Sequence, residues 1–337
     1  MTWIIATLWP VSTTKENLLK LHEAGADIFR LNFAHYTPDQ AKPYVQMIRK
    51  VQKESGKKFT LLLDTEGPCV RTGTLTTPKI YKTGDTFKIY IDLKWIKKSD
   101  QTSLFCDYSH LIQDVKINGI IKIDAGLFQV KVLEKWPDFI LVQALNDFTV
   151  GSRRHVTLPG VHIQLPSFTA KDKQNVLYAI EAGFEYVALS FVRSAHDMQE
   201  LRTFLDSYDG QHIKIIAKIE NEEGIKNIAS IAKVSDMVMV ARGDLWTELP
   251  IENIPVYQLE IIRAVRNANK KVIVATEMLE SMIHNPLPTR AEVNDIFYAV
   301  IEWADFVMLS WETAVGEHPV QCVEMMKKVA DLAEEYV

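Results

Sequence analysis

The chain has 337 residues, of which 47% are hydrophobic and 24% are charged, and its formal net charge is -5. This composition is typical of a globular protein with enough core for one large domain or two smaller ones. The small negative charge gives no reason to expect nucleic acid or a membrane surface as a partner, and no apolar run is long enough to span a bilayer. Three cysteines without paired spacing, Cys69, Cys106 and Cys322, indicate reduced thiols and a cytoplasmic setting.

The chain opens with alternating strand and helix patterns. Strand-like runs at residues 3–8, 27–33 and 59–64 enclose helical patterns at 15–24 and 38–54. After an interruption, further strands are predicted at 186–191, 213–219, 237–241, 271–276 and 306–310, with helical patterns at 171–182, 195–205, 222–232, 256–268 and 291–302. Eight such units predict an α/β fold with a closed (β/α)8 TIM barrel, and an open doubly wound sheet is the alternative.

The interruption, residues 71–158, has a different pattern. Several of its runs alternate apolar and polar residues with period two, and Gly, Asn-Gly, Asn-Asp and Pro-Asp turns separate them. This pattern predicts a small all-β domain inserted after strand 3 of a barrel made of residues 1–70 and 159–337. A domain on a loop at the C-terminal face of a barrel is placed to act as a lid.

Polar side chains follow the predicted barrel strands. In barrels of this kind, catalytic groups lie at the C-terminal ends of the strands. In chain order, these ends carry Arg30, Asn32, Asp64, Thr65, Ser190, Lys218, Glu220, Asp244, Thr276, Ser310 and Glu312. A whole ring of such residues indicates a site for an anion and a metal ion rather than routine capping.

The strongest chemical signal comes from Lys218, Glu220 and Asp244. Side chains alternate along a strand, so Lys218 and Glu220 are expected on the same side. Two acids and a lysine at strand ends suit a divalent cation and an oxyanion, because carboxylates are hard metal ligands and lysine is a mobile cation. The alternative is a lysine–glutamate ion pair that caps a strand.

Seven motifs resemble those of the pyruvate kinases and occur in that family's order. They are R-L-N-F-A-H (30–35), L-L-D-T-E-G-P-C-V-R-T-G (62–73), A-K-I-E-N (217–221), A-R-G-D-L (241–245), A-T-E-M-L-E-S-M (275–282), P-T-R-A-E-V-N-D (288–295) and M-L-S-W-E-T-A (308–314). The resemblance covers almost the whole chain but not the family's C-terminal regulatory domain, because the sequence stops at Val337.

The resemblance implies a phosphotransferase that moves phosphate between phosphoenolpyruvate, or a close enol phosphate, and ADP or another nucleoside diphosphate, forming pyruvate and ATP through a magnesium-bound enolate. Glu220 and Asp244 would hold Mg²⁺ or Mn²⁺. The backbone amides of Gly243 and Asp244 would receive the substrate carboxylate at a helix start. A homodimer contact through the barrel near residues 288–295 is also implied.

The family roles carry over to further residues. Lys218 would neutralise the phosphoryl group in transfer and contact the substrate, and Arg30 and Arg71 would clamp phosphate oxygens. Thr276 would contact the substrate and place the water that protonates the enolate carbon. The nucleotide would be bound by Asn32, His35, Arg71 and Arg154.

Departures from the family pattern concentrate on the nucleotide side. Trp9, Trp246 and Trp311 stand where glycine is usual, and Val315 replaces a lysine. Either the tryptophans pack under a remodelled rim, or they reshape or fill the nucleotide pocket.

The family's monovalent-cation site is also incomplete. Ala34 replaces a serine, and Cys69 stands where an acid usually accompanies potassium dependence. The residues that remain are Asn32, Asp64 and Thr65. We therefore predict weak or absent activation by K⁺.

Two rival functions stay open. The same barrel, with its metal acids and lysine, would enolise a 2-oxo acid without a nucleotide, in lyase or proton-transfer chemistry. Alternatively, the chain is a non-catalytic binding homologue. The retention of Lys218, Glu220, Asp244 and Thr276 argues against the binding homologue, since a pure binder has no evident need for all four.

Overall fold

The computed structural model describes residues 1–9, 12–96, 100 and 102–337. This part of the chain divides into two compact units. The barrel unit comprises residues 1–67, 166–245 and 252–337, and the β unit comprises residues 68–165 and 246–251. The sequence patterns place residues 246–251 in the barrel, whereas the structure groups them with the β unit. Within the described ranges, no helix combines the length and apolar character needed to cross a membrane.

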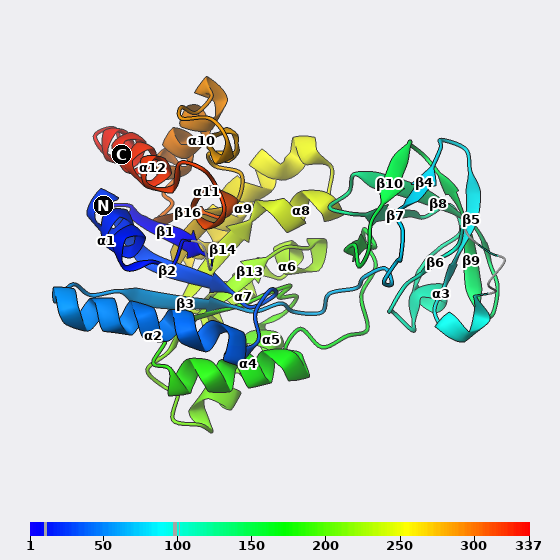
Figure 1. The fold of residues 1–337 in the computed structure, drawn as a ribbon, viewed down its shortest axis with the longest axis horizontal. Coiled ribbons are helices and arrows are strands. Elements are labelled where there is room, and N and C mark those ends of the chain that lie inside the picture. The colour runs from blue at the N-terminus through cyan, green and yellow to red at the C-terminus, as the bar shows by residue number, and fades with distance from the viewer. Residues whose placement is uncertain (10–11, 97–99, 101) are drawn as a thin grey trace. The chain divides into compact units, whose positions relative to one another are not determined.

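The barrel unit is built on a closed sheet of parallel strands (Figure 1). The strands are β1 (Trp3–Leu8), β2 (Ala26–Asn32), β3 (Thr60–Asp64), β12 (Tyr186–Leu189), β13 (Lys214–Ile219), β14 (Met237–Ala241), β15 (Lys271–Ala275) and β16 (Phe306–Leu309). Their order around the barrel is β1-β16-β15-β14-β13-β12-β3-β2. The predicted (β/α)8 barrel is confirmed, and the open sheet is excluded because β1 pairs with both β16 and β2.

The barrel strands are apolar on both faces. All five residues of β14 are buried, as expected for a parallel strand covered by helices on one side and by the barrel interior on the other. Side chains from all eight strands, including Ile5, Ile28, Leu62 and Met239, form one buried cluster. Burying an aliphatic side chain of this size stabilises the fold by about 1.5–3 kcal/mol.

Helices surround the barrel strands (Figure 1). They are α1 (Lys15–Ala24), α2 (Pro38–Ser55), α4 (Ala170–Glu181), α5 (Ala195–Asp206), α6 (Glu222–Lys226), α7 (Ile228–Val234), α8 (Arg242–Glu248), α9 (Ile254–Asn267), α10 (Arg290–Ile301), α11 (Trp311–Ala314) and α12 (Pro319–Glu334). Their limits follow local signals: α2 begins with a capping box between Thr37 and Gln40 and ends at Gly56, whose φ is 71°.

Four barrel strands end one or two residues earlier than the sequence patterns predict, and in two of them left-handed backbone follows the strand. The strand predicted at 186–191 ends at Leu189, and the one predicted at 271–276 ends at Ala275. Phe191 and Thr276 have φ angles of 52° and 73°, in the left-handed region. Such backbone costs about 1–3 kcal/mol for a residue other than glycine and occurs preferentially at functional sites. Both turns lie at the C-terminal ends of barrel strands.

The β unit confirms the predicted all-β insertion after strand 3. Its main sheet contains β5 (Thr86–Tyr90), β6 (Leu104–Phe105), β7 (Ile120–Ile123), β8 (Phe128–Lys135), β9 (Phe139–Ala144) and β11 (Val156–Thr157), in the order β11-β7-β8-β9-β5-β6. A second pair joins β4 (Lys79–Tyr81) to β10 (Phe148–Val150), and α3 (Leu111–Asp114) is a short helix. Apolar residues at alternate positions, such as Phe128, Val130 and Val132, form a core of its own.

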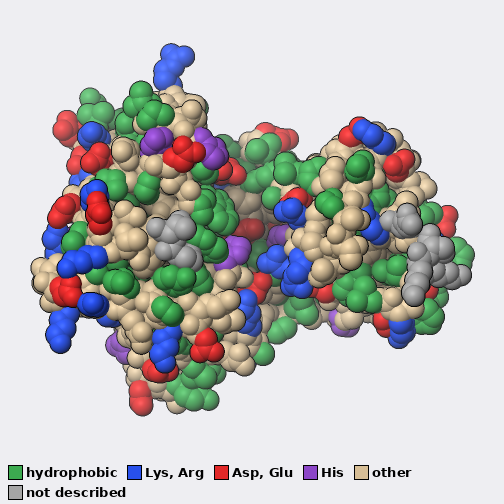
Figure 2. All heavy atoms as spheres, viewed as in Figure 1, with side chains coloured by type: hydrophobic (Ala, Val, Ile, Leu, Met, Phe, Trp, Pro, Cys, Tyr) green, Lys and Arg blue, Asp and Glu red, His purple; other side chains and the backbone are tan. Residues whose placement is uncertain are grey.

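The surface carries charges of both signs. On the face shown in Figure 2, acidic and basic side chains are interspersed over the barrel unit. This mixed distribution over the barrel unit is in keeping with the small formal net charge of -5.

Candidate active site at the barrel mouth

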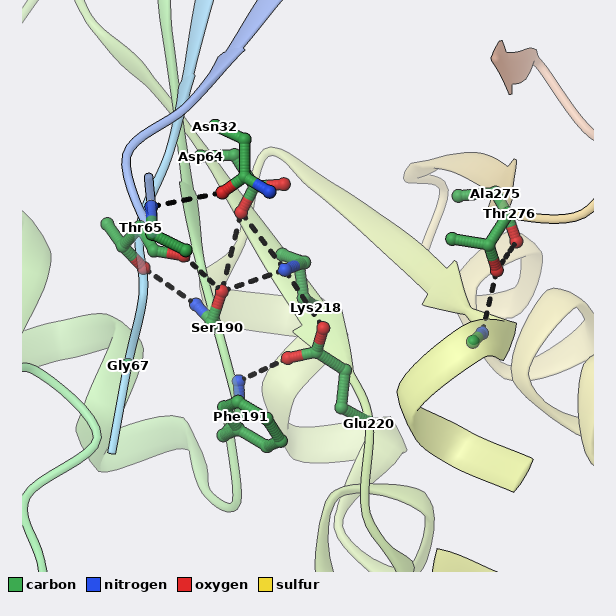
Figure 3. Close-up of polar contacts among 12 residues, drawn as sticks. Asn32, Asp64, Thr65, Gly67, Ser190, Phe191, Lys218, Glu220, Ala275 and Thr276 are labelled. Carbon is green, nitrogen blue, oxygen red and sulfur yellow. Dashed lines mark hydrogen bonds and ion pairs between the residues drawn. The ribbon is translucent and has the colours of Figure 1, made fainter. Parts of the chain in front are cut away.

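The buried carboxylate of Asp64 lies with two cations, Arg30 and Lys218, at the C-terminal ends of the barrel strands; Figure 3 shows its contact with Lys218. Arg30 Nε donates to Asp64 Oδ2 at 2.7 Å, and Lys218 Nζ lies 3.0 Å from Asp64 Oδ1. Burial by itself would raise the pKa of Asp64, but the attraction of Lys218 and Arg30 lowers this pKa overall. Asp64 is therefore ionised at neutral pH and fixes both cations.

Lys218 is the centre of this network. Its Nζ donates to Ser190 Oγ at 2.8 Å and lies 2.9 Å from Glu220 Oε1, in addition to its contact with Asp64. Burial opposes the charged form, yet the attraction of Asp64 and Glu220 raises the Lys218 pKa above its usual value. Lys218 is only 7% exposed and its ammonium stays charged, so its field acts with little screening by water.

Glu220 is fully buried and only partly satisfied. Its Oε2 accepts a hydrogen bond of 2.6 Å from the backbone N–H of Phe191, which the left-handed turn at Phe191 directs toward it. Its Oε1 is close to Lys218 but, among the described residues, has no hydrogen bond of acceptable geometry. Burial raises the Glu220 pKa to about 8, against the attraction of Lys218, and the nearby negative charge of Asp244 adds to this increase.

These carboxylates fit a divalent cation. Asp244 lies in the first turn of α8 and acts electrostatically on both Lys218 and Glu220. Among the residues that the structure describes, no group of three or more His, Cys, Asp or Glu side chains forms a complete metal cage. Mg²⁺ is commonly held by one or two carboxylates together with water and substrate oxygens. Glu220 and Asp244, with the unsatisfied Oε1, match that arrangement.

A second group of polar contacts links β14 to β15. The backbone N–H of Gly243 donates to Thr276 Oγ1 at 2.7 Å, and Thr276 Oγ1 donates to the carbonyl of Ala275 at 2.6 Å (Figure 3). Arg242 forms a bidentate pair with Asp295, both distances being 2.6 Å, and donates to the Thr276 carbonyl at 2.7 Å. Arg242 thereby holds the strained Thr276 turn beside the start of α8.

The residues predicted for a monovalent cation also lie beside this network. Asn32 Oδ1 accepts a hydrogen bond from the backbone N–H of Ala34 at 3.1 Å. Thr65 Oγ1 accepts from the backbone N–H of Ser190 at 2.9 Å (Figure 3). The Asp64 carboxylate between them already contacts two protein cations.

The residues predicted to bind the nucleotide are divided between the units. His35 belongs to the barrel unit, where its ring lies 5.3 Å from Trp9 and 5.8 Å from Trp311. Arg71 and Arg154 belong to the β unit. There Arg71 Nη1 donates to the Arg153 carbonyl at 3.4 Å, and Arg154 Nη1 lies 3.4 Å from Asp124 Oδ1.

The three unusual tryptophans likewise do not form one group. Trp9 and Trp311 are in contact with each other in the barrel unit, with ring centroids 6.3 Å apart. Trp246 belongs to the β unit, where its ring packs on the turn at Gly126: a Cβ atom added to this glycine would lie 3.3 Å from the ring. Trp9 and Trp311 are therefore considered together below, without Trp246.

Sequence reasoning gave no specific role to several residues of the site. Thr7 Oγ1 accepts from Arg30 Nη1 at 2.9 Å, and Ser190 bridges Lys218 to the Thr65 carbonyl. Ser190 was recognisable as a polar strand end, and Arg242 lies inside the A-R-G-D-L motif. Thr7 carried no such signal, because it lies within β1 rather than after it, and its contact depends on the pairing of β1 with β2.

Comparisons with known proteins agree with this geometry. The family model "Pyruvate kinase, barrel domain" matches residues 1–323. Pyruvate kinase from Sporosarcina psychrophila is 41% identical over 333 residues, which cover 98% of this chain and 56% of that protein. Pyruvate kinase from Clostridium perfringens is 39% identical over 334 residues, which cover 99% of this chain and 70% of that protein. The chain thus spans little more than half the length of the first of these relatives.

A solved structure gives the same result. A pyruvate kinase from Cryptosporidium parvum superposes with a TM-score of 0.94 at 39% identity, covering 100% of this chain and 70% of that chain. The sequence match and the structural match to pyruvate kinases therefore each cover nearly the whole chain. The chain belongs to the pyruvate kinase family.

Proposed function

We propose that the chain is a phosphotransferase that moves a phosphoryl group between phosphoenolpyruvate, or a close enol phosphate, and a nucleoside diphosphate such as ADP. The observation that carries this proposal is the buried, charged Lys218 held between Asp64 and Glu220 and under the influence of Asp244. The relatives named pyruvate kinase share this barrel over nearly its whole length.

The metal requirement of the family fits the donor set. Glu220 and Asp244 would hold Mg²⁺ or Mn²⁺, which supplies Lewis-acid charge beside the oxygen atoms of an enol or 2-oxo acid. Burial favours the protonated form of Glu220, and the positive charge of Lys218, 2.9 Å from its Oε1, favours the ionised form that a metal ion needs.

Lys218 and Arg30 are proposed to handle the phosphoryl group. A phosphoryl group in transfer carries negative charge on its oxygen atoms, and preorganised cations stabilise that charge without reorganising. Both side chains are fixed by Asp64, and both are less than 9% exposed. Their positions are therefore set before the substrate arrives.

Thr276 and the start of α8 are proposed to bind the three-carbon acid. Backbone N–H groups at a helix start attract a carboxylate. In the structure, the N–H of Gly243 is paired with Thr276 Oγ1, so binding of a carboxylate there would exchange this contact and release the hydroxyl. The released hydroxyl would orient the water that protonates the enol carbon.

The remaining predicted roles stay proposals. Arg71 and Arg154 would bind nucleotide phosphates, and the β unit would act as a lid that excludes water during transfer. A homodimer through residues 288–295 and a cytoplasmic location also stay predictions.

A coupled assay tests the proposal. The protein is mixed with phosphoenolpyruvate, Mg²⁺ and a panel of nucleoside diphosphates, and pyruvate is measured. Pyruvate formation that requires both the metal and a diphosphate is the expected result. Exchange of pyruvate methyl protons with D₂O in the presence of metal, without any phosphoryl transfer, would instead support the enolising alternative and reject the proposal.

A further inference from the structure

Three rings pack together in the barrel unit where β16, β1 and β2 end. Trp9 lies 5.3 Å from His35 and 6.3 Å from Trp311, both edge-on, and His35 lies 5.8 Å from Trp311. The ring of Tyr36, which is buried, packs against this group with its centroid 5.1 Å from that of Trp9. Because each ring contacts the other two, the cluster is held in one arrangement rather than left mobile.

The outer side of this cluster is open. Trp311 is 44% exposed, and Val315, one turn further along the chain, is 45% exposed. His35 is exposed as well, whereas Trp9 is half-buried. This surface therefore presents a fixed aromatic ring, Trp311, beside an aliphatic side chain, Val315. Val315 stands where the family pattern has a lysine.

The aromatic cluster follows the same strand ends that hold Arg30 through hydrogen bonds. Arg30 donates to Thr7 Oγ1, and Thr7 Oγ1 donates to the carbonyl of Leu309 at 2.8 Å. Trp9 and Trp311 each follow one of these two residues by two positions. The two tryptophans thus lie just beyond the ends of β1 and β16, the strands that carry Thr7 and Leu309.

We propose that Trp311 is a stacking platform for the base of the nucleoside diphosphate. A ligand with anionic phosphates at one end and a flat apolar ring at the other matches a fixed cation beside an exposed aromatic ring. Stacking on Trp311 would supply binding energy in place of the ion pair that a lysine at position 315 would make. This inference rests on the proposed function, because it names how the acceptor is recognised.

The test measures binding without turnover. Affinities of ADP, adenosine and inorganic pyrophosphate, in the presence of Mg²⁺, are measured by calorimetry and by quenching of tryptophan fluorescence. Trp311→Ala is expected to weaken ADP and adenosine binding about 5- to 150-fold, the range of a base–aromatic stack, and to leave pyrophosphate binding unchanged. Trp311→Phe, which keeps a flat ring, is expected to restore most of the loss.

Trp3→Ala is the matched control. Trp3 is 42% exposed and packs on Phe306, so it resembles Trp311 in exposure and lies on the same two strands. It stands at the opposite end of β1, about 20 Å away for six residues of extended chain. Its removal should not change the affinity for ADP.

The outcomes separate this inference from the proposed function. Unchanged or tighter ADP binding in Trp311→Ala, or an equal loss for pyrophosphate, would overturn the stacking role. If Trp311→Ala turns over phosphoenolpyruvate and binds ADP with unchanged affinity, the stacking role is overturned and the proposed function stands. Stacking of ADP on Trp311 without phosphoryl transfer would support this inference and reject the proposed function.

Discussion

Two sectors of the barrel mouth hold their side chains by different forces. Where β3, β12 and β13 end, Asp64, Lys218 and Glu220 are buried and linked by ion pairs. Where β16, β1 and β2 end, His35 and Trp311 are exposed and held by ring contacts. The first sector is electrostatic and buried, and the second is aromatic and open.

The difference shows which of the two sectors tolerates substitutions without loss of the fold. Removing one member of a buried ion pair leaves a charge without compensation, at about 3–5 kcal/mol. An exposed ring can be replaced at much smaller cost, because water covers the surface that it leaves. The chemistry of transfer is therefore expected to depend on the first sector, and recognition of the acceptor on the second.

The largest effect is expected from Asp64→Asn, which removes the carboxylate at the centre of the electrostatic sector. It leaves Arg30 and Lys218 without their shared carboxylate, so the free energy of unfolding should fall by about 3–5 kcal/mol in urea titrations. Asp147→Asn is the control, because Asp147 pairs with Lys82 on the surface of the β unit and its replacement should leave the transition unchanged. Equal transitions for the two variants would show that the buried network does not stabilise the fold.

The second effect concerns catalysis. Lys218→Met should lower kcat for phosphoryl transfer by at least about 10²- to 10³-fold, because it removes a preorganised cation. Binding of Mn²⁺, followed by electron paramagnetic resonance, should persist and would show that the site still forms. Lys214→Met, an exposed position at the start of the same strand, should keep wild-type turnover. A kcat unchanged in Lys218→Met would refute the role assigned to this lysine.

The third effect tests a residue that acts through others. Arg242→Lys keeps the charge but loses the bidentate contact with Asp295 and the hold on the Thr276 carbonyl. Misplacement of a catalytic group by about 1 Å reduces rates by up to about 10²-fold, so kcat should fall about 10- to 100-fold with a smaller change in the KM for ADP. Arg266→Lys, which alters a more exposed pair with Asp305, is the control and should behave as wild type. If both variants have the same kcat, Arg242 has no positioning role.

The fourth effect is a pH dependence of metal affinity. Burial raises the pKa of Glu220 to about 8, so protons compete with the metal below that pH. Affinity for Mn²⁺ should rise with pH up to about 8, by at most about tenfold per pH unit, and then level off. The sign for stability is opposite: the folded-state pKa lies above the unfolded value of 4.5, so the metal-free protein loses stability as pH rises between 4.5 and about 8. A metal affinity independent of pH from 6.5 to 9 would contradict this reading.

The smallest effect is the response to potassium. Arg30 and Lys218 already neutralise Asp64, which supports the expectation that a monovalent cation adds little. At saturating Mg²⁺, replacing tetramethylammonium chloride by KCl at constant ionic strength should change kcat less than about twofold. A strong requirement for K⁺ would reject the prediction.

The amino-acid sequence by itself determined the barrel and the identity of its reactive groups. Apolar runs such as Met237–Ala241, separated by amphipathic helices, can bury both faces only in a parallel sheet covered by helices. Polar residues placed directly after such runs must then gather at one end of the barrel. For this reason the sequence alone indicates Lys218 and Glu220 as groups of the site.

Only the tertiary structure decided how these groups are held. Thr7 bonds to Leu309 across 302 residues of chain, and Arg242 reaches Asp295 across 53. The left-handed turns at Phe191 and Thr276 likewise have no local sequence signature. Local periodicity records which face of a strand is apolar, but the distances between side chains depend on closure of the sheet, which joins β1 to β16 and packs their ends against each other.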